Sequence, residues 1–220
     1  MKNNRIITID GPSASGKGLL AKSLAEELDF ILLDSGLLYR AYSYCFDKAK
    51  SHSIAAEFFS KLEIAGVIGE MEVYEGNVNI TKLLRHEAVA KSASKLSSLK
   101  ETRDNLITFQ RNLANDKGLV ADGRDMGTVV FPDAATKIFL IADVEVRAQR
   151  RFLELQNNDQ GVNMRDLIDN IRLRDEADKA REISPLIPAL DSIEVNSSNL
   201  KPQEVLDTVL KIYKEQIKEI

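Results

Sequence analysis

The sequence is poor in the residues from which disulfides and many metal sites are built. Cys45 is the only cysteine among 220 residues, which excludes an internal disulfide and any zinc site made of cysteines. His52 and His86 are the only histidines, and we expect both to be surface or helix residues with ordinary partners, because a triad or histidine-rich metal site needs better-placed neighbours. The chain therefore favours chemistry that needs neither a thiol nor an imidazole.

Long hydrophobic runs and an excess of positive charge are also absent. No stretch of about 18 apolar residues occurs, and the first residues lead directly into a strand, so we expect no membrane span or secretory signal and a cytoplasmic location. The formal net charge of −4 argues against nucleic acid as a partner. A length of 220 residues with 44% hydrophobic content suits one α/β domain with small insertions.

The most informative stretch is DGPSASGKG at 10–18, which lies between an apolar β-branched run and a run of helical spacing. The spacing from Gly11 to Gly16 and Lys17 fits G-x-x-x-x-G-K, the phosphate-binding loop. Backbone N–H groups and the start of the next helix would surround an oligophosphate, and Lys17 would reach its outer phosphates. The residues expected to form this nucleotide site are Gly11, Pro12, Ser13, Ala14, Ser15, Gly16, Lys17, Gly18 and Leu19.

The pattern of strand, polar turn and helix recurs along the chain. Residues 30–33 lead into Asp34-Ser35-Gly36 and a helix, and residues 119–121 lead into the polar turn 122–125. The first two such units predict a parallel sheet flanked by helices, with the phosphate loop and the 34–36 turn at the same edge. Residues 53–79 differ: we predict a helix continuing to Ala65 and then antiparallel strands joined by a hairpin turn at 75–77.

Later elements are predicted from the same periodicities. We expect strands at 138–142 and 193–195, helices at 143–155 and 163–181, a polar serine-rich passage at 92–98 between helical runs, and a closing helix that begins at Pro202.

Phosphoryl transfer requires alignment of two reactants, Mg²⁺ and positive charge around the moving group. The chain contains residues suited to each of these requirements. Asp122, at the end of a strand, can hold Mg²⁺ through water, whereas Asp10 more often satisfies N–H groups of its own loop. The arginines that can surround phosphate are Arg40, Arg124, Arg147, Arg151, Arg174 and Arg181. Those in the charged helices can equally belong to a solvated face with ion pairs. A phosphate acceptor needs no base, because its second pKa of about 6 leaves it mostly dianionic at neutral pH.

Four strings carry a resemblance that covers the chain from end to end: ITIDGPSASGKG at 7–18, LLDSGLLYR at 32–40, ADGRDMGTVVFPDA at 121–134 and RDEADKAREISPLIPA at 174–189. Together they are similar to bacterial cytidylate kinases, a family of nucleoside monophosphate kinases. The resemblance implies an α/β P-loop kinase fold in one domain, 1–220. Within it, it implies a monophosphate-binding region at about 35–115 with an insertion at 53–80, and a helical lid at about 151–181.

The resemblance also implies a monomer that uses ATP and Mg²⁺ to phosphorylate CMP and dCMP. Ser35 and Arg40 would contact the acceptor nucleotide. Ser94, Arg103 and Asp125 would read the cytosine, since its 4-amino group donates while N3 and O2 accept.

The remaining positions follow the same resemblance. Arg124 and Arg181 would contact the phosphate and the surroundings of the base, and Arg174 and Asp178 the sugar. The residues expected around the transferred phosphoryl group are Lys17, Arg124, Arg147, Arg151 and Arg181.

Two departures and two alternatives remain at this stage. Gly18 follows Lys17 in place of the usual hydroxyl residue, and Leu19 stands where the family commonly has threonine, so a hydroxyl contact to the donor phosphates is missing. Another monophosphate kinase, or a related small-molecule kinase such as shikimate kinase, would keep the loop and change the acceptor. A nucleotide switch of the GTPase type would need an N-K-x-D string, and none occurs.

Overall fold

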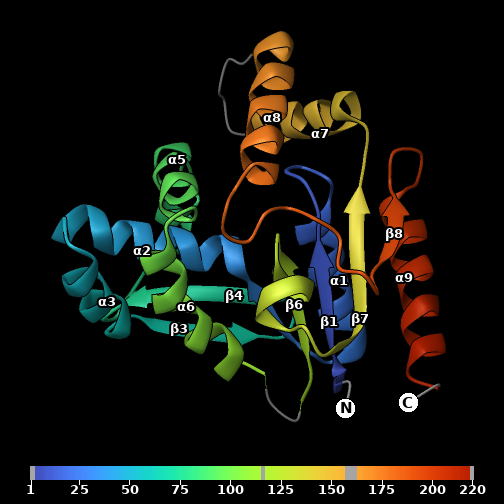
Figure 1. The fold of residues 1–220 in the computed structure, drawn as a ribbon, viewed down its shortest axis with the longest axis horizontal. Helices are drawn as coiled ribbons and strands as arrows, with labels where there is room; N and C mark the ends of the chain where they lie inside the picture. The colour runs from blue at the N-terminus through green and yellow to red at the C-terminus, as the bar shows by residue number, and fades with distance from the viewer. Residues whose placement is uncertain (1–2, 115–116, 157–162, 219–220) are drawn as a thin grey trace. The chain divides into compact units, whose positions relative to one another are not determined.

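The computed structural model describes residues 3–114, 117–156 and 163–218. They divide into two compact units, which we call the first unit (Met1–Leu20 and Arg124–Ile220) and the second unit (Ala21–Gly123). Each unit contains parallel strands accompanied by helices, as the sequence predicted (Figure 1). Among the described residues, no helix combines the length and apolar content needed to cross a membrane.

Three parallel strands form the core of the first unit: β1 (Asn3–Asp10), β7 (Ala134–Ile141) and β8 (Ile193–Asn196). Ile9 of β1 pairs with Ile138, and Leu140 pairs with Val195. Residues 6–9 of β1 (Ile-Ile-Thr-Ile) are all buried, so both faces of this strand are covered, as is usual for parallel strands. The closing helix α9 (Pro202–Gln216) packs against β7, with proline in its first turn (Figure 1).

Two packed helices complete the first unit: α7 (Val144–Gln156) and α8 (Met164–Lys179). Ala148, Leu167 and Ile171 form the buried centre of their interface. The helices 143–155 and 163–181 were therefore predicted to within about two residues at each end. The expected lid, 151–181, includes residues 157–162, which lie outside the described residues.

Two parallel strands of the second unit, β2 (Ile31–Asp34) and β6 (Leu119–Gly123), end in polar turns at the same edge. Asp34 pairs in register with Asp122. Asp34 also caps helix α2 (Ser35–Ala49), because its carboxylate accepts a hydrogen bond from Leu37 N at 2.9 Å. The parallel pairing of these two strands, which the sequence predicted, is confirmed.

Residues 52–79 contain helix α3 (His52–Ser60) and an antiparallel sheet of β3 (Glu63–Val67), β4 (Glu70–Glu75) and β5 (Val78–Asn79). The predicted antiparallel strands and their turn after Glu75 are confirmed. The predicted helix to Ala65 is wrong, because α3 ends at Ser60 and Ala65 pairs with Glu72 in the sheet. A short apolar run fits the residue spacing of a helix and of a strand equally well, and here the pairing with β4 makes it a strand.

The rest of the second unit is helical, with α4 (Thr81–Leu84), α5 (Glu87–Leu96) and α6 (Lys100–Asn112). The prediction that residues 92–98 interrupt the helical region is largely wrong, because helix α5 continues through Leu96. The first unit also holds a π-helical turn that the sequence did not predict, η1 (Met126–Val130).

His52 and Cys45, which belong to the two scarce residue types, both contact or pack against other parts of the protein. His52 Nδ1 lies 3.1 Å from the Tyr42 hydroxyl and its Nε2 lies 3.4 Å from Glu101. Cys45 is buried, and burial raises the pKa of its thiol to about 11, so it is a poor nucleophile.

Candidate functional site

The phosphate-binding loop connects β1 to helix α1 (Lys17–Leu28), and the loop with the first turn of α1 belongs to the first unit. Its backbone takes positive φ angles of 149° at Gly11, 58° at Ala14 and 97° at Gly16. A Cβ atom at Gly11 would lie 2.1 Å from the carbonyl oxygen of Leu140, so a side chain there would collide with β7. The loop therefore needs its first glycine for space and for conformation.

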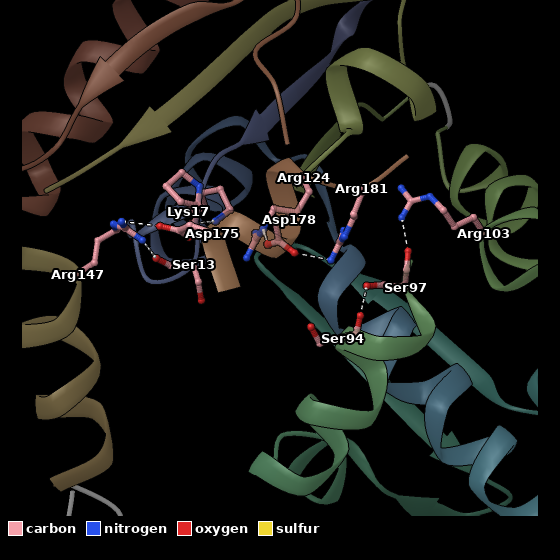
Figure 2. Close-up of polar contacts among 11 residues, drawn as sticks. Ser13, Lys17, Ser94, Ser97, Arg103, Arg124, Arg147, Asp175, Asp178 and Arg181 are labelled. Carbon is pink, nitrogen blue, oxygen red and sulfur yellow. Dashed lines mark hydrogen bonds and ion pairs between the residues drawn. The ribbon is translucent and has the colours of Figure 1, made fainter. Parts of the chain in front are cut away.

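Cationic side chains hold the carbonyl groups of this loop. Lys17 Nζ donates to Pro12 O at 2.7 Å, and Arg150 Nη1 donates to Ser15 O at 2.9 Å. Figure 2 shows Arg147, whose Nη1 donates to Ser13 O at 3.1 Å. The C=O and N–H of a trans peptide point in opposite directions, so the N–H that follows each held carbonyl faces away from the cation. The hydroxyl of Ser15 is buried without a hydrogen-bond partner in the described part of the chain.

These features fit an oligophosphate, which needs unpaired N–H donors and positive charge and no further carbonyl oxygens. The loop meets each need: its N–H groups face away from the cations, a helix begins at Lys17, and Lys17 itself is 5% exposed beside the loop. Leu19 in the next turn is 56% exposed.

Arg147, expected around the transferred phosphoryl group, is buried and forms hydrogen bonds and an ion pair with other residues of the protein. Its side chain is 7% exposed, its Nε donates to Ala142 O at 2.9 Å, and its Nη2 lies 2.7 Å from Asp175 (Figure 2). Arg147 therefore links α7, α8 and the phosphate loop. Arg151 lies on the more exposed part of α7 and pairs with Glu154 at 3.0 Å.

Asp178 joins two of the predicted arginines. Its carboxylate accepts a hydrogen bond from Arg124 Nε at 3.0 Å and forms a second ion pair with Arg181, as Figure 2 shows. The Asp178 side chain is 2% exposed, whereas those of Arg124 and Arg181 are 20% and 10% exposed. Arg174, on the same helix as Asp178, is exposed. The structure thus brings Arg124, Asp178 and Arg181 together within the first unit.

Asp10 has a different role from the one expected. Its carboxylate accepts hydrogen bonds from Met126 N at 2.9 Å and Gly127 N at 2.8 Å, so it binds η1 and not its own loop. Burial raises the pKa of Asp10 to about 7, opposed by these two hydrogen bonds. Asp125, which begins this turn, is 2% exposed, and its carbonyl accepts from Val129 N. Asp10 therefore fixes the segment that follows Arg124 and Asp125.

In the second unit, Arg103 is 8% exposed and lies over the Tyr39 ring at 5.5 Å. Its Nη1 donates to Ser97 O at 2.8 Å, and the Ser97 hydroxyl donates to Ser94 O at 2.9 Å (Figure 2). The structure therefore joins the predicted Ser94 and Arg103 through a residue that the sequence did not single out.

The two predicted contacts to the acceptor nucleotide both lie on α2. Ser35 is buried at its first position, and Arg40 donates to Leu84 O at 3.1 Å.

The predicted metal residue Asp122 lies at the end of β6 and is partly exposed. The described residues include no group of three or more His, Cys, Asp or Glu side chains that could hold a metal ion. A single carboxylate such as that of Asp122 is chemically compatible with Mg²⁺, which usually takes one or two carboxylates together with substrate phosphates and water.

Four residues of the site were not among the predicted site residues: Ser97, Arg150, Asp175 and Ser197. Arg150 follows Arg147 by three positions on one helix, a spacing that could have indicated a shared face. Asp175 and Ser197 had no such signal, because their partners are distant in the sequence.

The sequence matches one family of known proteins over most of its length. Residues 7–215 match the family described as cytidylate kinase. A cytidylate kinase from Pseudomonas fluorescens is 43% identical over 217 residues, covering 93% of each chain. One from Mannheimia succiniciproducens is 40% identical over 224 residues, covering 99% of this chain and 100% of the relative.

Solved structures are similar at much lower identity. An uncharacterized protein from Eubacterium ventriosum has a TM-score of 0.50 at 15% identity and covers 97% of this chain and 99% of its own, a likeness of fold alone. A shikimate kinase from Bacteroides thetaiotaomicron has a TM-score of 0.49 at 14% identity, with 98% of each chain covered. The match to the family over most of the sequence, with relatives above 40% identity at nearly full length, shows that the chain belongs to the cytidylate kinase family.

Proposed function

We propose that the protein transfers the γ-phosphoryl group of MgATP to CMP and also to dCMP, giving ADP and the nucleoside diphosphate. The chain is an ATP-dependent kinase of the P-loop fold, as the sequence predicted, and its curated relatives are cytidylate kinases. Acceptors such as shikimate gain no support from those relatives.

The observation that carries the proposal is the form of the phosphate loop. Its carbonyls at Pro12, Ser13 and Ser15 are held by cationic side chains, which leaves N–H groups for an anion. Lys17 can exchange its short contact to Pro12 O for a phosphate oxygen, because both are acceptors and the lysine chain is flexible. This arrangement supports binding of the ATP triphosphate.

The chemistry of the acceptor explains why a base is unnecessary. A nucleoside monophosphate is mostly dianionic at neutral pH, with a second pKa of about 6, so it is already a nucleophile. What the protein must add is positive charge around the moving group, since phosphoryl transfer depends on positioning and electrostatics. We assign this to Lys17, Arg124 and Arg181, and to Arg147 through its hold on the loop. Arg151 stays a prediction for the same role.

When bound, Mg²⁺ supplies charge neutralisation between the phosphates of ATP. Asp122 would hold it through water, because a single carboxylate is a sufficient protein donor when phosphate oxygens complete the coordination.

Selection of cytosine is proposed to depend on Ser94, Arg103 and Asp125. The Asp125 carboxylate would accept from the 4-amino group, and Arg103 and Ser94 would donate to N3 and O2. Uracil carries an oxygen at position 4, which would face the carboxylate and leave polar groups unpaired. Ser35 and Arg40 would contact the same nucleotide, and Arg174 and Asp178 its sugar.

The test is ADP release over a panel of CMP, dCMP, UMP, AMP, GMP and shikimate, with ATP as donor. We expect CMP and dCMP to be the best acceptors. In Asp125→Ala, kcat/KM for CMP should fall by about tenfold to a hundredfold, the size expected for a lost hydrogen bond to a charged group. ATP affinity should stay within about twofold of the wild-type value, because Asp125 is assigned to the base and not to the triphosphate.

A matched control is Asp133→Ala, which removes an exposed carboxylate from the same segment. Equal activity of Asp125→Ala and Asp133→Ala on CMP would remove the assignment. A best acceptor other than a cytidine monophosphate would remove the proposed function.

A further inference from the structure

We propose that Arg150 and Ser197 are positioning residues that fix the orientation of the Ser15–Gly16 peptide in the phosphate loop. The inference deepens the proposed function and rests on it, because the purpose of this orientation is to present the Gly16 N–H to the phosphates of ATP.

The contacts form a closed set around one carbonyl oxygen. Arg150 Nη1 donates to Ser15 O at 2.9 Å and also lies 3.0 Å from the Ser197 hydroxyl, while Nη2 donates to Ser197 O at 2.7 Å. The Ser197 hydroxyl is 3.1 Å from both Ser15 O and Ile141 O, so it can donate to either. Ser197 is 2% exposed, and its N–H donates to Ile141 O at 2.8 Å. The carbonyl of Ser15 is therefore held by a guanidinium that is itself fixed to the end of β8.

Holding the carbonyl also fixes the amide. The Ser15–Gly16 peptide is trans and planar, so a carbonyl that points to Arg150 forces the Gly16 N–H in the opposite direction. A cation on the carbonyl also polarises the peptide and makes its N–H a stronger donor. The contacts of Arg150 and Ser197 to Ser15 O therefore act on an N–H group that would contact phosphate.

Gly16 itself offers little steric resistance to rotation of this peptide. Gly16 has φ of 97°, and a Cβ atom built on it would meet only Arg150 Nη1 within 4 Å, at 3.6 Å. Glycine allows rotation of the preceding peptide at little steric cost. A rotated peptide would turn the Ser15 carbonyl toward the anion. A loop that lacks the contacts of Arg150 and Ser197 to this carbonyl should therefore bind triphosphate more weakly.

A second arginine makes the same type of contact. Arg147 precedes Arg150 by one turn of α7 and donates to Ser13 O at 3.1 Å. Two residues on one helix thus hold alternate carbonyls of the loop, and each fixes the direction of the N–H that follows. This repetition indicates that α7 sets the conformation of the loop and does not merely pack beside it.

The experiment compares Arg150→Met, Arg150→Lys and Ser197→Ala with the wild-type protein. The control is Arg172→Met, because Arg172 forms only an exposed ion pair with Glu145 at 3.4 Å. Calorimetry with ATP gives the dissociation constant, and selective ¹⁵N-glycine labelling follows the Gly16 amide without any reaction. Thermal unfolding of each variant separates a local effect from loss of the fold.

We expect Arg150→Met to weaken ATP binding by about tenfold or more, as for a lost hydrogen bond from a charged group, and to shift the Gly16 amide resonance in the free protein. Arg150→Lys should recover part of the affinity, because an ammonium can reach one of the two carbonyls but not both in a fork. Ser197→Ala should have a smaller effect in the same direction. Arg172→Met should match the wild-type protein.

The inference is overturned if Arg150→Met binds ATP like Arg172→Met, or if the Gly16 amide resonance does not move. If Arg150→Met does not fold, Arg150→Lys and Ser197→Ala decide by the same two measurements. Failure of the proposed function has a separate sign, namely a wild-type protein that phosphorylates no cytidine monophosphate while the Gly16 amide still responds to Arg150.

Discussion

Replacing Asp178 by asparagine tests the cluster of Arg124, Asp178 and Arg181 directly. The substitution keeps the shape of a side chain that is 2% exposed and removes its charge. Both arginines are at least 80% buried, so neither can recover full hydration when the carboxylate is lost. Breaking a buried ion pair by removing one partner costs about 3–5 kcal/mol.

We expect Asp178→Asn to lower the free energy of unfolding by about 3 kcal/mol. This is the lower end of the range, because the amide keeps one accepting oxygen. For a chain of this length such a loss lowers Tm by about 6–12 °C. The assay is thermal and denaturant unfolding beside Asp169→Asn, the same chemical change at an exposed position of α8. If Asp178→Asn unfolds with the same Tm and midpoint as Asp169→Asn, the cluster contributes nothing to stability and the reasoning is refuted.

Two further predictions follow from Asp10 and Leu19. Because the pKa of Asp10 is raised from 3.8 to about 7, the folded protein binds a proton between these values that the unfolded chain does not. The free energy of unfolding, measured relative to Asp10→Asn, should therefore fall by a few kcal/mol as pH rises from about 4 to 7; a flat difference across that range would contradict the assignment. Leu19→Thr should lower the KM for ATP or raise kcat through the restored hydroxyl, with little change in stability because Leu19 is 56% exposed; steady-state kinetics with varied ATP checks this, and unchanged constants would remove the idea.

Structural features formed by residues that are close together in the sequence were predictable. The phosphate loop needs only the spacing of Gly11, Gly16 and Lys17 between a strand and a helix, and all these parts are local. The hairpin after Glu75 and the polar turn at Asp34 were found for the same reason. Where the local signal was ambiguous, as around Ala65, strand pairing settled the structure.

The partners within the site were not predictable in this way. Asp10 binds amides 116 and 117 residues away, Arg150 binds a carbonyl 135 residues away, and Ser197 approaches Ser15 across 182 residues. A periodicity or motif describes neighbours along the chain and carries no information about such pairs.

The residue types and spacings of this chain were enough to specify a phosphate-binding loop, parallel strands with acidic ends and a family. Which carboxylate faces which arginine, and which carbonyl each arginine holds, depended on folding, because charged side chains are placed by the burial of the elements that carry them. Two contacts are the clearest cases: packing brings Arg124 to 3.0 Å from Asp178 across 54 residues, and Arg150 to 2.9 Å from Ser15 O across 135 residues.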